Sequence, residues 1–179
     1  MRIVAGELRG RRIVAPAGTA TRTTTDKARQ ATFNALGSLN AVVGANVVDL
    51  FAGSGALGIE ALSRGAAHCT CVERDRVALD ALRSNIETLE LGERASVIRG
   101  DGLVHAGSTH DATLVLADPP YSFAQWPELL ECLSSPIVVA ESDRELTNEI
   151  AGCIDWQVIR TKRYGRAYVT FIQRIPYRS

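Results

Sequence analysis

The sequence contains no apolar run approaching the ~20 residues that a membrane-spanning helix requires. It also does not begin like a signal peptide, because Arg9, Arg11 and Arg12 interrupt any apolar stretch near the N-terminus. Repeats and low-complexity linkers are missing as well. A chain of 179 residues is about one domain long. We therefore expect a single cytoplasmic domain without a membrane partner.

Cysteine and histidine are scarce, and their spacing does not suit a metal site. The four cysteines form no pair of CxxC motifs and have no His-rich partner segment. Cys69 and Cys71 stand two apart in an expected strand, so they share a face and are badly placed to bond each other. The sequence predicts reduced thiols and no bound metal.

The formal net charge at pH 7 is zero, but the charges are unevenly distributed along the chain. Residues 1–30 hold seven Lys or Arg against two acids, and residues 156–179 hold six against none. This pattern favours a polyanion held by the two ends, although clustered terminal charge is often only solvated. The candidate contacts are Arg2, Arg9, Arg11, Arg12 and Arg22 in an N-terminal clamp, with Arg163 and Arg166 as a second contact.

Apolar strand-like segments alternate with helix-like segments through the chain. Strands are expected over residues 46–51, 69–73, 96–99, 112–117 and 137–140, and helices over about 25–39, 57–64, 75–89, 127–133 and 145–150. Such alternation predicts a doubly wound α/β fold, in which a mostly parallel sheet is covered on both faces.

The two ends of the chain depart from this alternation. The closing strands, 156–162 and 167–174, must pair antiparallel because the connection between them is so short. Two short strands around Gly6 and Gly10 predict an N-terminal hairpin. We assign residues 1–20 to a basic β-hairpin extension and residues 21–179 to the main domain, with a seven-stranded sheet.

A glycine-rich turn follows the first strand of the main domain. Gly53, Gly55 and Gly58 form a GxGxxG pattern that permits a sharp turn and close approach of the backbone to a ligand. Glu73 ends the next strand, where it is placed to hold ribose hydroxyls. This pattern alone suits NAD as well as S-adenosylmethionine.

Two further acids favour S-adenosylmethionine. Asp49, four residues before Gly53, is placed to orient the ammonium group of a methionine moiety, for which a dinucleotide has no counterpart. Asp101 ends the third strand and could accept from an adenine amino group. The expected cofactor residues are Asp49, Phe51, Ala52, Gly53, Ser54, Gly55, Glu73, Asp101 and Gly102.

The fourth strand delivers Asp118-Pro119-Pro120-Tyr121 to the same edge of the sheet. Two prolines make this turn rigid, and proline has no N–H to satisfy nearby carbonyls. The Asp118 carboxylate and the Pro119 carbonyl could hold the two hydrogens of an exocyclic base amine, and Tyr121 could stack on the base. The tetrapeptide therefore predicts methylation of an amino group on a nucleic-acid base.

These residues resemble the class I, Rossmann-like methyltransferases that act on amino groups. The whole chain resembles the RsmD family of bacterial guanine-N2 methyltransferases of 16S ribosomal RNA. The signs are Met1–Gly6 with Gly10-Arg11, residues 21–29 leading into Phe33-Asn34, and the run from Asp49 to Ala66. The Asp-Pro-Pro-Tyr sequence alone would be shared with many DNA methyltransferases.

The resemblance implies N2 methylation of one guanine near the P site of an assembled or nearly assembled small subunit, with S-adenosylmethionine as methyl donor. The sequence departs from the family at Thr23, where proline is usual, and at Gln30, where glutamate is usual. Both positions lie in the segment expected to border the cofactor and the RNA.

Three other functions compete with this interpretation. A DNA amino-methyltransferase would need a sequence-reading domain, for which the chain has no room. Enzymes that methylate protein glutamine resemble this chain but carry Asn where Asp118 stands. A non-catalytic RNA-binding module would not need the complete motif set, from Asp49 to Tyr121, that the chain retains.

Overall fold

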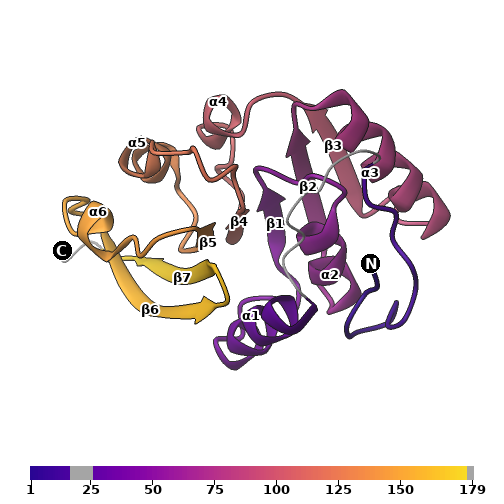
Figure 1. Ribbon diagram of the computed structural model, residues 1–179, viewed down its shortest axis with the longest axis horizontal. Coiled ribbons are helices and arrows are strands. Elements are labelled where there is room, and N and C mark those ends of the chain that lie inside the picture. Colours follow the sequence, from indigo (N-terminus) through magenta and orange to yellow (C-terminus); the bar gives the residue numbers. More distant parts are fainter. Residues whose placement is uncertain (17–25, 177–179) are drawn as a thin grey trace.

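The computed structural model describes residues 1–16 and 26–176, which form a seven-stranded sheet with helices on both faces (Figure 1). The strand order is β3-β2-β1-β4-β5-β7-β6. The strands are β1 (Asn46–Asp49), β2 (His68–Glu73), β3 (Ala95–Arg99), β4 (Leu114–Ala117), β5 (Ile137–Ser142), β6 (Trp156–Tyr164) and β7 (Ala167–Arg174). The first five are parallel, and β7 pairs antiparallel with both β5 and β6. The expected fold class is confirmed.

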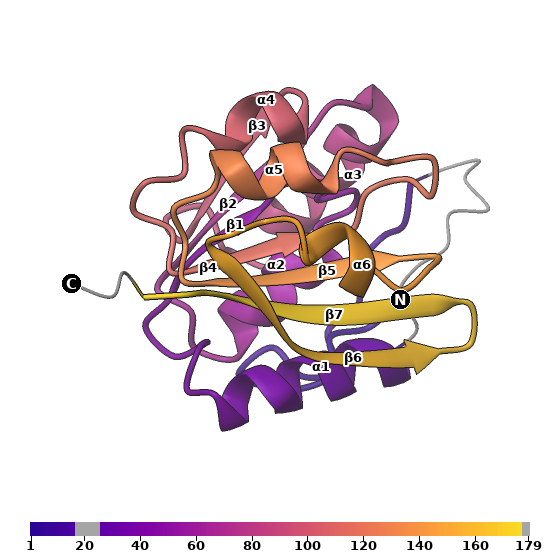
Figure 2. The same ribbon diagram turned by 90° about the vertical axis from the view of Figure 1, so that its left-hand side faces the viewer.

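Alternating strand residues build two separate apolar layers. Val47 and Leu114 belong to one buried cluster, whereas their neighbours Val48 and Val115 belong to the other. The first layer contains α1 (Asp26–Ser38), α2 (Ala56–Ser63) and α3 (Arg76–Thr88), and the second contains α4 (Gly102–Ala106), α5 (Trp126–Cys132) and α6 (Thr147–Ile150). Figure 2 shows α5 and α1 on opposite sides of the sheet. Burial of both strand faces explains the continuous apolar runs in the sequence.

The expected helices lie within about two residues of the bounds predicted from the sequence. The five-residue helix α4 was not expected, because it is too short to show a helical period in the sequence. Helix α1 begins at Asp26, and residue 25, where it was expected to begin, lies outside the described residues. None of the helices among residues 1–16 and 26–176 is long and apolar enough to cross a membrane.

The N-terminal arm, residues 1–16, folds back antiparallel on itself as expected, but it lacks the regular strands of a β-hairpin. A single isolated bridge joins Arg2 to Arg12 in place of two regular strands. Ile3 and Ile13 are both buried in the same apolar layer as α2 and α3, so the arm is packed onto the main domain. The proposed boundary between residues 20 and 21 lies outside the described residues.

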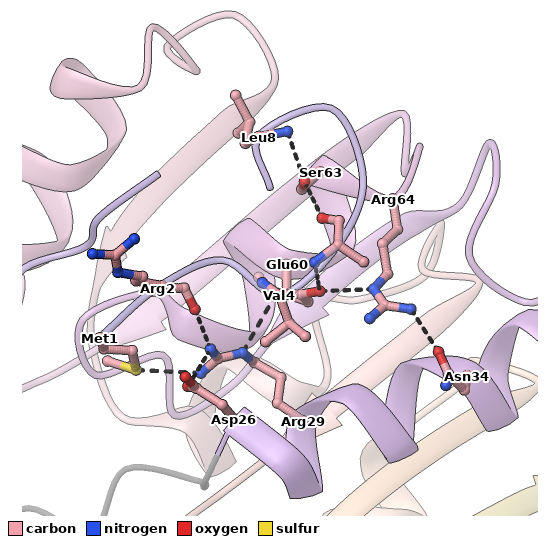
Figure 3. A network of polar contacts seen from close by, with 12 residues as sticks. Met1, Arg2, Val4, Leu8, Asp26, Arg29, Asn34, Glu60, Ser63 and Arg64 are labelled. Atoms are coloured by element: carbon pink, nitrogen blue, oxygen red, sulfur yellow. Dashed lines mark hydrogen bonds and ion pairs between the residues drawn. The ribbon is translucent and has the colours of Figure 1, made fainter. Parts of the chain in front are cut away.

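A buried ion pair fastens the arm to two helices (Figure 3). Arg29 of α1 and Glu60 of α2 are both fully buried, with Arg29 Nε 3.4 Å from Glu60 Oε2. The Glu60 carboxylate also accepts the backbone N–H groups of Val4 at 2.8 Å and Ala5 at 3.1 Å. Arg29 in turn donates to the carbonyl of Arg2. The arm therefore supplies backbone partners that offset the desolvation of both charges.

The Glu60 carboxylate also binds a second arginine, next to the end of α2. Glu60 Oε1 accepts from Arg64 Nε at 2.7 Å, and Arg64 reaches on to Asn34 Oδ1 at 3.1 Å. The Arg64 guanidinium lies 5.3 Å from the centre of the Phe33 ring. Helices α1 and α2 are thus held together by one network that also receives the arm.

Replacing Glu60 tests how much this network stabilises the fold. Glu60→Ala leaves Arg29 buried without its carboxylate, so we expect a loss of about 3–5 kcal/mol in the free energy of unfolding, measured with urea. Asp26→Ala is the matched control, because Asp26 pairs with the same guanidinium but is 62% exposed. It should cost less than about 1 kcal/mol. Equal losses in the free energy of unfolding for the two variants would show that the buried pair stabilises the fold no more than the exposed pair does.

Candidate active site

The parallel strands place the expected motifs at one edge of the sheet. The glycine turn follows β1, Glu73 is the last residue of β2, Asp101 follows β3 and Asp118 follows β4. Ser142 at the end of β5 pairs with Tyr168 at the start of β7. Residues 163–166 comprise the end of β6 and the connection to β7, and we call them the β6–β7 turn. This turn therefore lies at the same edge. Parallel α/β sheets bind ligands at their carboxyl edge.

A cavity of about 530 Å³ opens among these loops. Ten of the expected site residues line it: Asp49, Phe51, Ala52, Gly53, Ser54, Glu73, Gly102, Asp118, Pro119 and Pro120. Three expected residues do not line it: Gly55, Asp101 and Tyr121. The cavity wall also contains residues that the motifs did not indicate, among them Met1 and Pro16 from the arm and Arg74, Asp75 and Ala78 around the start of α3.

Asp49 is buried at the base of the cavity. Its Oδ2 accepts the backbone N–H of Gly58 at 3.1 Å, while its Oδ1 is buried without a hydrogen-bond partner among the described residues. Burial raises the pKa of Asp49 to about 7, against the lowering effect of the Gly58 N–H. The free oxygen can accept a hydrogen bond from a polar or cationic ligand group.

Gly58 is required by close packing between α2 and β2. A Cβ at this position would stand 2.7 Å from the sulfur of Cys69 and 3.1 Å from that of Cys71. The two sulfurs lie 3.7 Å apart, and both thiols are free. Hydrogen bonding to Cys71, together with burial, raises the pKa of Cys69 well above its ordinary value. These thiols pack under the helix as reduced side chains.

Glu73 is engaged by backbone groups of the glycine turn and of the loop after β2. Its Oε2 accepts from Gly53 N–H at 2.8 Å, and its Oε1 accepts from Arg74 N–H at 2.8 Å and Asp75 N–H at 2.7 Å. A carboxylate offers about four acceptor sites, so these bonds leave capacity on Oε2. Glu73 thus braces the turn and still faces the cavity.

Asp101 has a different environment from the one expected. Its Oδ1 accepts from Leu103 N–H at 3.0 Å and caps α4, and its Oδ2 lies 3.2 Å from Arg74 Nη1. The neighbouring Gly102 forms the cavity wall instead. A Cβ on Gly102 would stand 2.2 Å from the carbonyl of Leu50 and 2.9 Å from the Phe51 ring. The backbone must come this close, so only glycine fits here.

Asp118 and its prolines form the wall beyond β4. Asp118 is half-buried, Pro119 is buried and Pro120 is exposed. Phe123, which belongs to none of the sequence motifs, donates its N–H to the Pro120 carbonyl at 2.8 Å. Its ring contacts Phe51 at 5.4 Å and Trp126 at 5.1 Å between centroids, both edge-to-face. This aromatic row ties the Asp118 turn to the glycine turn.

The two basic ends lie differently with respect to the cavity. The β6–β7 turn lies at the same edge of the sheet as the cavity. In this turn Arg163 lies 5.4 Å from the Tyr168 ring centre, and Arg166 is exposed. The bend of the arm contacts Ser63, the last residue of α2, and Arg94, just before β3, which places it at the opposite edge. Arg9 and Arg11 lie in or next to that bend.

Three other arginines were predicted to bind RNA. Arg2 and Arg12 pair with each other in the isolated bridge of the arm, and both are exposed. Arg22 lies outside the described residues. Within residues 1–16 and 26–176, no group of three or more His, Cys, Asp or Glu side chains could hold a metal ion.

The sheet order with an antiparallel β7 and a glycine turn after β1 is that of the class I methyltransferases. A family model described as conserved hypothetical protein 95 matches residues 1–173. YlbH of Bacillus subtilis is 39% identical, with 97% of this chain and 99% of YlbH covered. The chain belongs to this family, the RsmD-like methyltransferases.

Two further comparisons agree with this assignment. Ribosomal RNA small subunit methyltransferase D of Escherichia coli is 34% identical, with 97% of this chain and 90% of that protein covered. Among solved structures, yhhF from Escherichia coli matches with a TM-score of 0.82 at 32% identity, over 98% of both chains. The similarity extends over the arm and the main domain together.

The raised pKa of Asp49 gives the protein a testable pH dependence. The pKa rises from 3.8 to about 7 on folding, so the folded state binds the extra proton and Asp49 destabilises the protein as the pH increases between these two values. Asp49→Asn removes this titration. We expect urea unfolding to show the variant gaining stability relative to the wild type from about pH 4 to pH 7. Parallel pH profiles for the two proteins would contradict the assignment.

Proposed function

We propose that this protein transfers a methyl group from S-adenosylmethionine to the exocyclic N2 amino group of a guanine in 16S ribosomal RNA of the small subunit. The observation that carries the proposal is the shared wall of one cavity: Asp118, Pro119 and Pro120 on one side and the glycine turn on the other. A relative of similar length, 34% identical, is named for methylation of small-subunit ribosomal RNA. Membership of the methyltransferase family supports the reaction type.

The cavity residues fit S-adenosylmethionine. The buried Asp49 Oδ1, which has no hydrogen-bond partner within residues 1–16 and 26–176, suits the ammonium of the methionine moiety, and the open acceptor site of Glu73 suits a ribose hydroxyl. Phe51 and Gly102 both line the cavity, and we assign the adenine ring to this part of it. When bound, S-adenosylmethionine supplies an electrophilic methyl group on a sulfonium. Asp101 remains a proposed partner of the adenine amino group, in competition with Leu103 and Arg74.

Asp118 and Pro119 position the accepting amine. The lone pair of an exocyclic amine is delocalised into the base, so the nitrogen is a poor nucleophile. Acceptance of its two hydrogens by the Asp118 carboxylate and the Pro119 carbonyl localises that lone pair toward the methyl group. The nitrogen would gain the methyl as the bond between the methyl carbon and the sulfonium sulfur breaks and leaves its electron pair on sulfur. The nitrogen would then give one hydrogen to solvent as a proton. We assign Tyr121, beside this turn, to stacking on the extruded base.

The proposal for Asp118 predicts a loss of turnover without a loss of cofactor. Asp118→Ala should abolish tritiated methyl transfer to small subunits from a strain lacking this gene, while calorimetric affinity for S-adenosylhomocysteine stays within about threefold, because the carboxylate meets the base. In the same assay, Tyr121→Phe should keep most activity and Tyr121→Ala should lose most of it. Full activity of Asp118→Ala would overturn the proposal, and methylation at another nucleoside would overturn its specificity.

The β6–β7 turn is the proposed RNA contact at the cavity edge. Arg163 and Arg166 lie two to three strand spacings from β4, or roughly 10–15 Å, and this separation supports contacts with phosphates near a base that reaches Asp118. Arg2 and Arg12 of the arm are proposed as outer phosphate contacts. The bend with Arg9 and Arg11 lies at the far edge and can meet only RNA that reaches around the domain.

Salt dependence separates the two basic ends. Each phosphate contact that is removed lowers the slope of log affinity against log salt by about one. The double change Arg163→Ala and Arg166→Ala should therefore lower the slope by about two for small-subunit RNA. Arg9→Ala serves as the matched control, and its slope should stay at the wild-type value. The reverse result would transfer the phosphate contact to the arm.

A further inference from the structure

The ends of the N-terminal arm form part of the cavity wall. Met1 and Pro16, which are far apart along the arm, both line the same cavity as the glycine turn. Between them the arm runs down beside α2 and α3 to its bend and returns (Figure 1). A ligand in the cavity would therefore contact the arm as well as the glycine turn.

Asn85 of α3 joins the arm directly to the glycine turn. Its side chain is buried, and its Oδ1 accepts the N–H of Val14 at 2.8 Å while its Nδ2 donates to the Val14 carbonyl at 2.9 Å. The same Nδ2 donates to the carbonyl of Ser54 at 2.9 Å. Ser54 lines the cavity, and Val14 lies two residues before Pro16. One amide therefore bonds both the cavity-lining glycine turn and the segment of the arm that leads to Pro16.

The other strand of the arm has a comparable anchor at its cavity end. Arg29 Nη1 lies 3.3 Å from the sulfur of Met1, and Arg29 is held in place by Glu60 and Asp26 (Figure 3). The bend is anchored separately by Ser63, whose Oγ donates to the Ala5 carbonyl at 2.6 Å and accepts from Leu8 N–H at 3.0 Å. The cavity end and the bend can thus be perturbed independently.

We propose that docking of the arm and binding of the cofactor are thermodynamically linked, with Asn85 as the positioning residue. This inference rests on the proposed function, in which the cavity holds S-adenosylmethionine. A ligand that fixes Ser54 also fixes the Asn85 amide, and this amide holds Val14, two residues before the cavity-lining Pro16. By reciprocity, a docked arm raises affinity for the cofactor as much as the cofactor stabilises the docked arm.

Hydrogen exchange measures this linkage in the unmodified protein. Addition of S-adenosylhomocysteine to the full chain should slow exchange of the Val14 amide about tenfold, within the usual range for coupled sites. The amide of Ala151, which bonds Thr147 in the distant helix α6, should not change. Unchanged exchange at Val14 in a protein that binds the ligand would overturn the inference.

Asn85→Asp removes the two donated bonds while keeping the size of the side chain. We expect it to weaken calorimetric affinity for S-adenosylhomocysteine about tenfold and to abolish the ligand effect on Val14 exchange. Ser63→Ala is the matched control, because it loosens the bend without touching the glycine turn. It should lower the melting temperature yet leave affinity within about twofold, as expected for uncoupled sites.

The remaining outcomes are distinct. If both variants lose affinity in proportion to their loss of melting temperature, general destabilisation explains the data and the linkage is wrong. If the wild type binds neither S-adenosylmethionine nor its product, the proposed cofactor is wrong and this inference falls with it. Normal wild-type binding with unaltered affinity in Asn85→Asp removes the inference alone.

Discussion

The buried pairing of Arg29 with Glu60 is the constraint on which the N-terminal half of the molecule depends. Two charges taken out of water are tolerable only when every nearby polar group is well placed, and here the partners come from α1, α2 and the backbone of the arm. The pair thus specifies the mutual position of three segments. Because α2 begins at the glycine turn and the arm ends at the cavity, this specification extends to the site.

The sheet divides two tasks between its two halves. On the β1 side, acids and backbone amides line a cavity, where Asp49 has lost enough hydration for its pKa to reach about 7. On the β6 side, exposed cations meet solvent at the same edge. Asp118 follows β4, near the middle of the sheet, between these two environments. A reaction between a small bound molecule and a large polyanion requires this kind of boundary.

The sequence predicted those parts of the molecule that depend on local pattern. Apolar runs such as Val47-Val48 identified the buried strands, and parallel order then brought the glycine turn and Asp118 to one edge. The arm could not be placed in this way, because its anchors are remote: Val14 bonds Asn85, 71 positions away. In the sequence, Asn85 is an ordinary polar position of a helix. Asp101 was predicted to accept from the adenine amino group, and the sequence did not indicate that its carboxylate would also bond Leu103 and Arg74.

The outer strand β6 has one further consequence. Its free side offers unpaired backbone groups that could recruit a strand from a second copy, the usual route to aggregation of open sheets. The register of β6 shifts between Val158 and Arg160, and Arg160, Lys162 and Arg163 are exposed along the strand. Irregular pairing and repulsion between like charges both oppose such recruitment. Arg163, which is proposed to contact RNA, therefore also opposes pairing of β6 with a neighbouring copy of the protein.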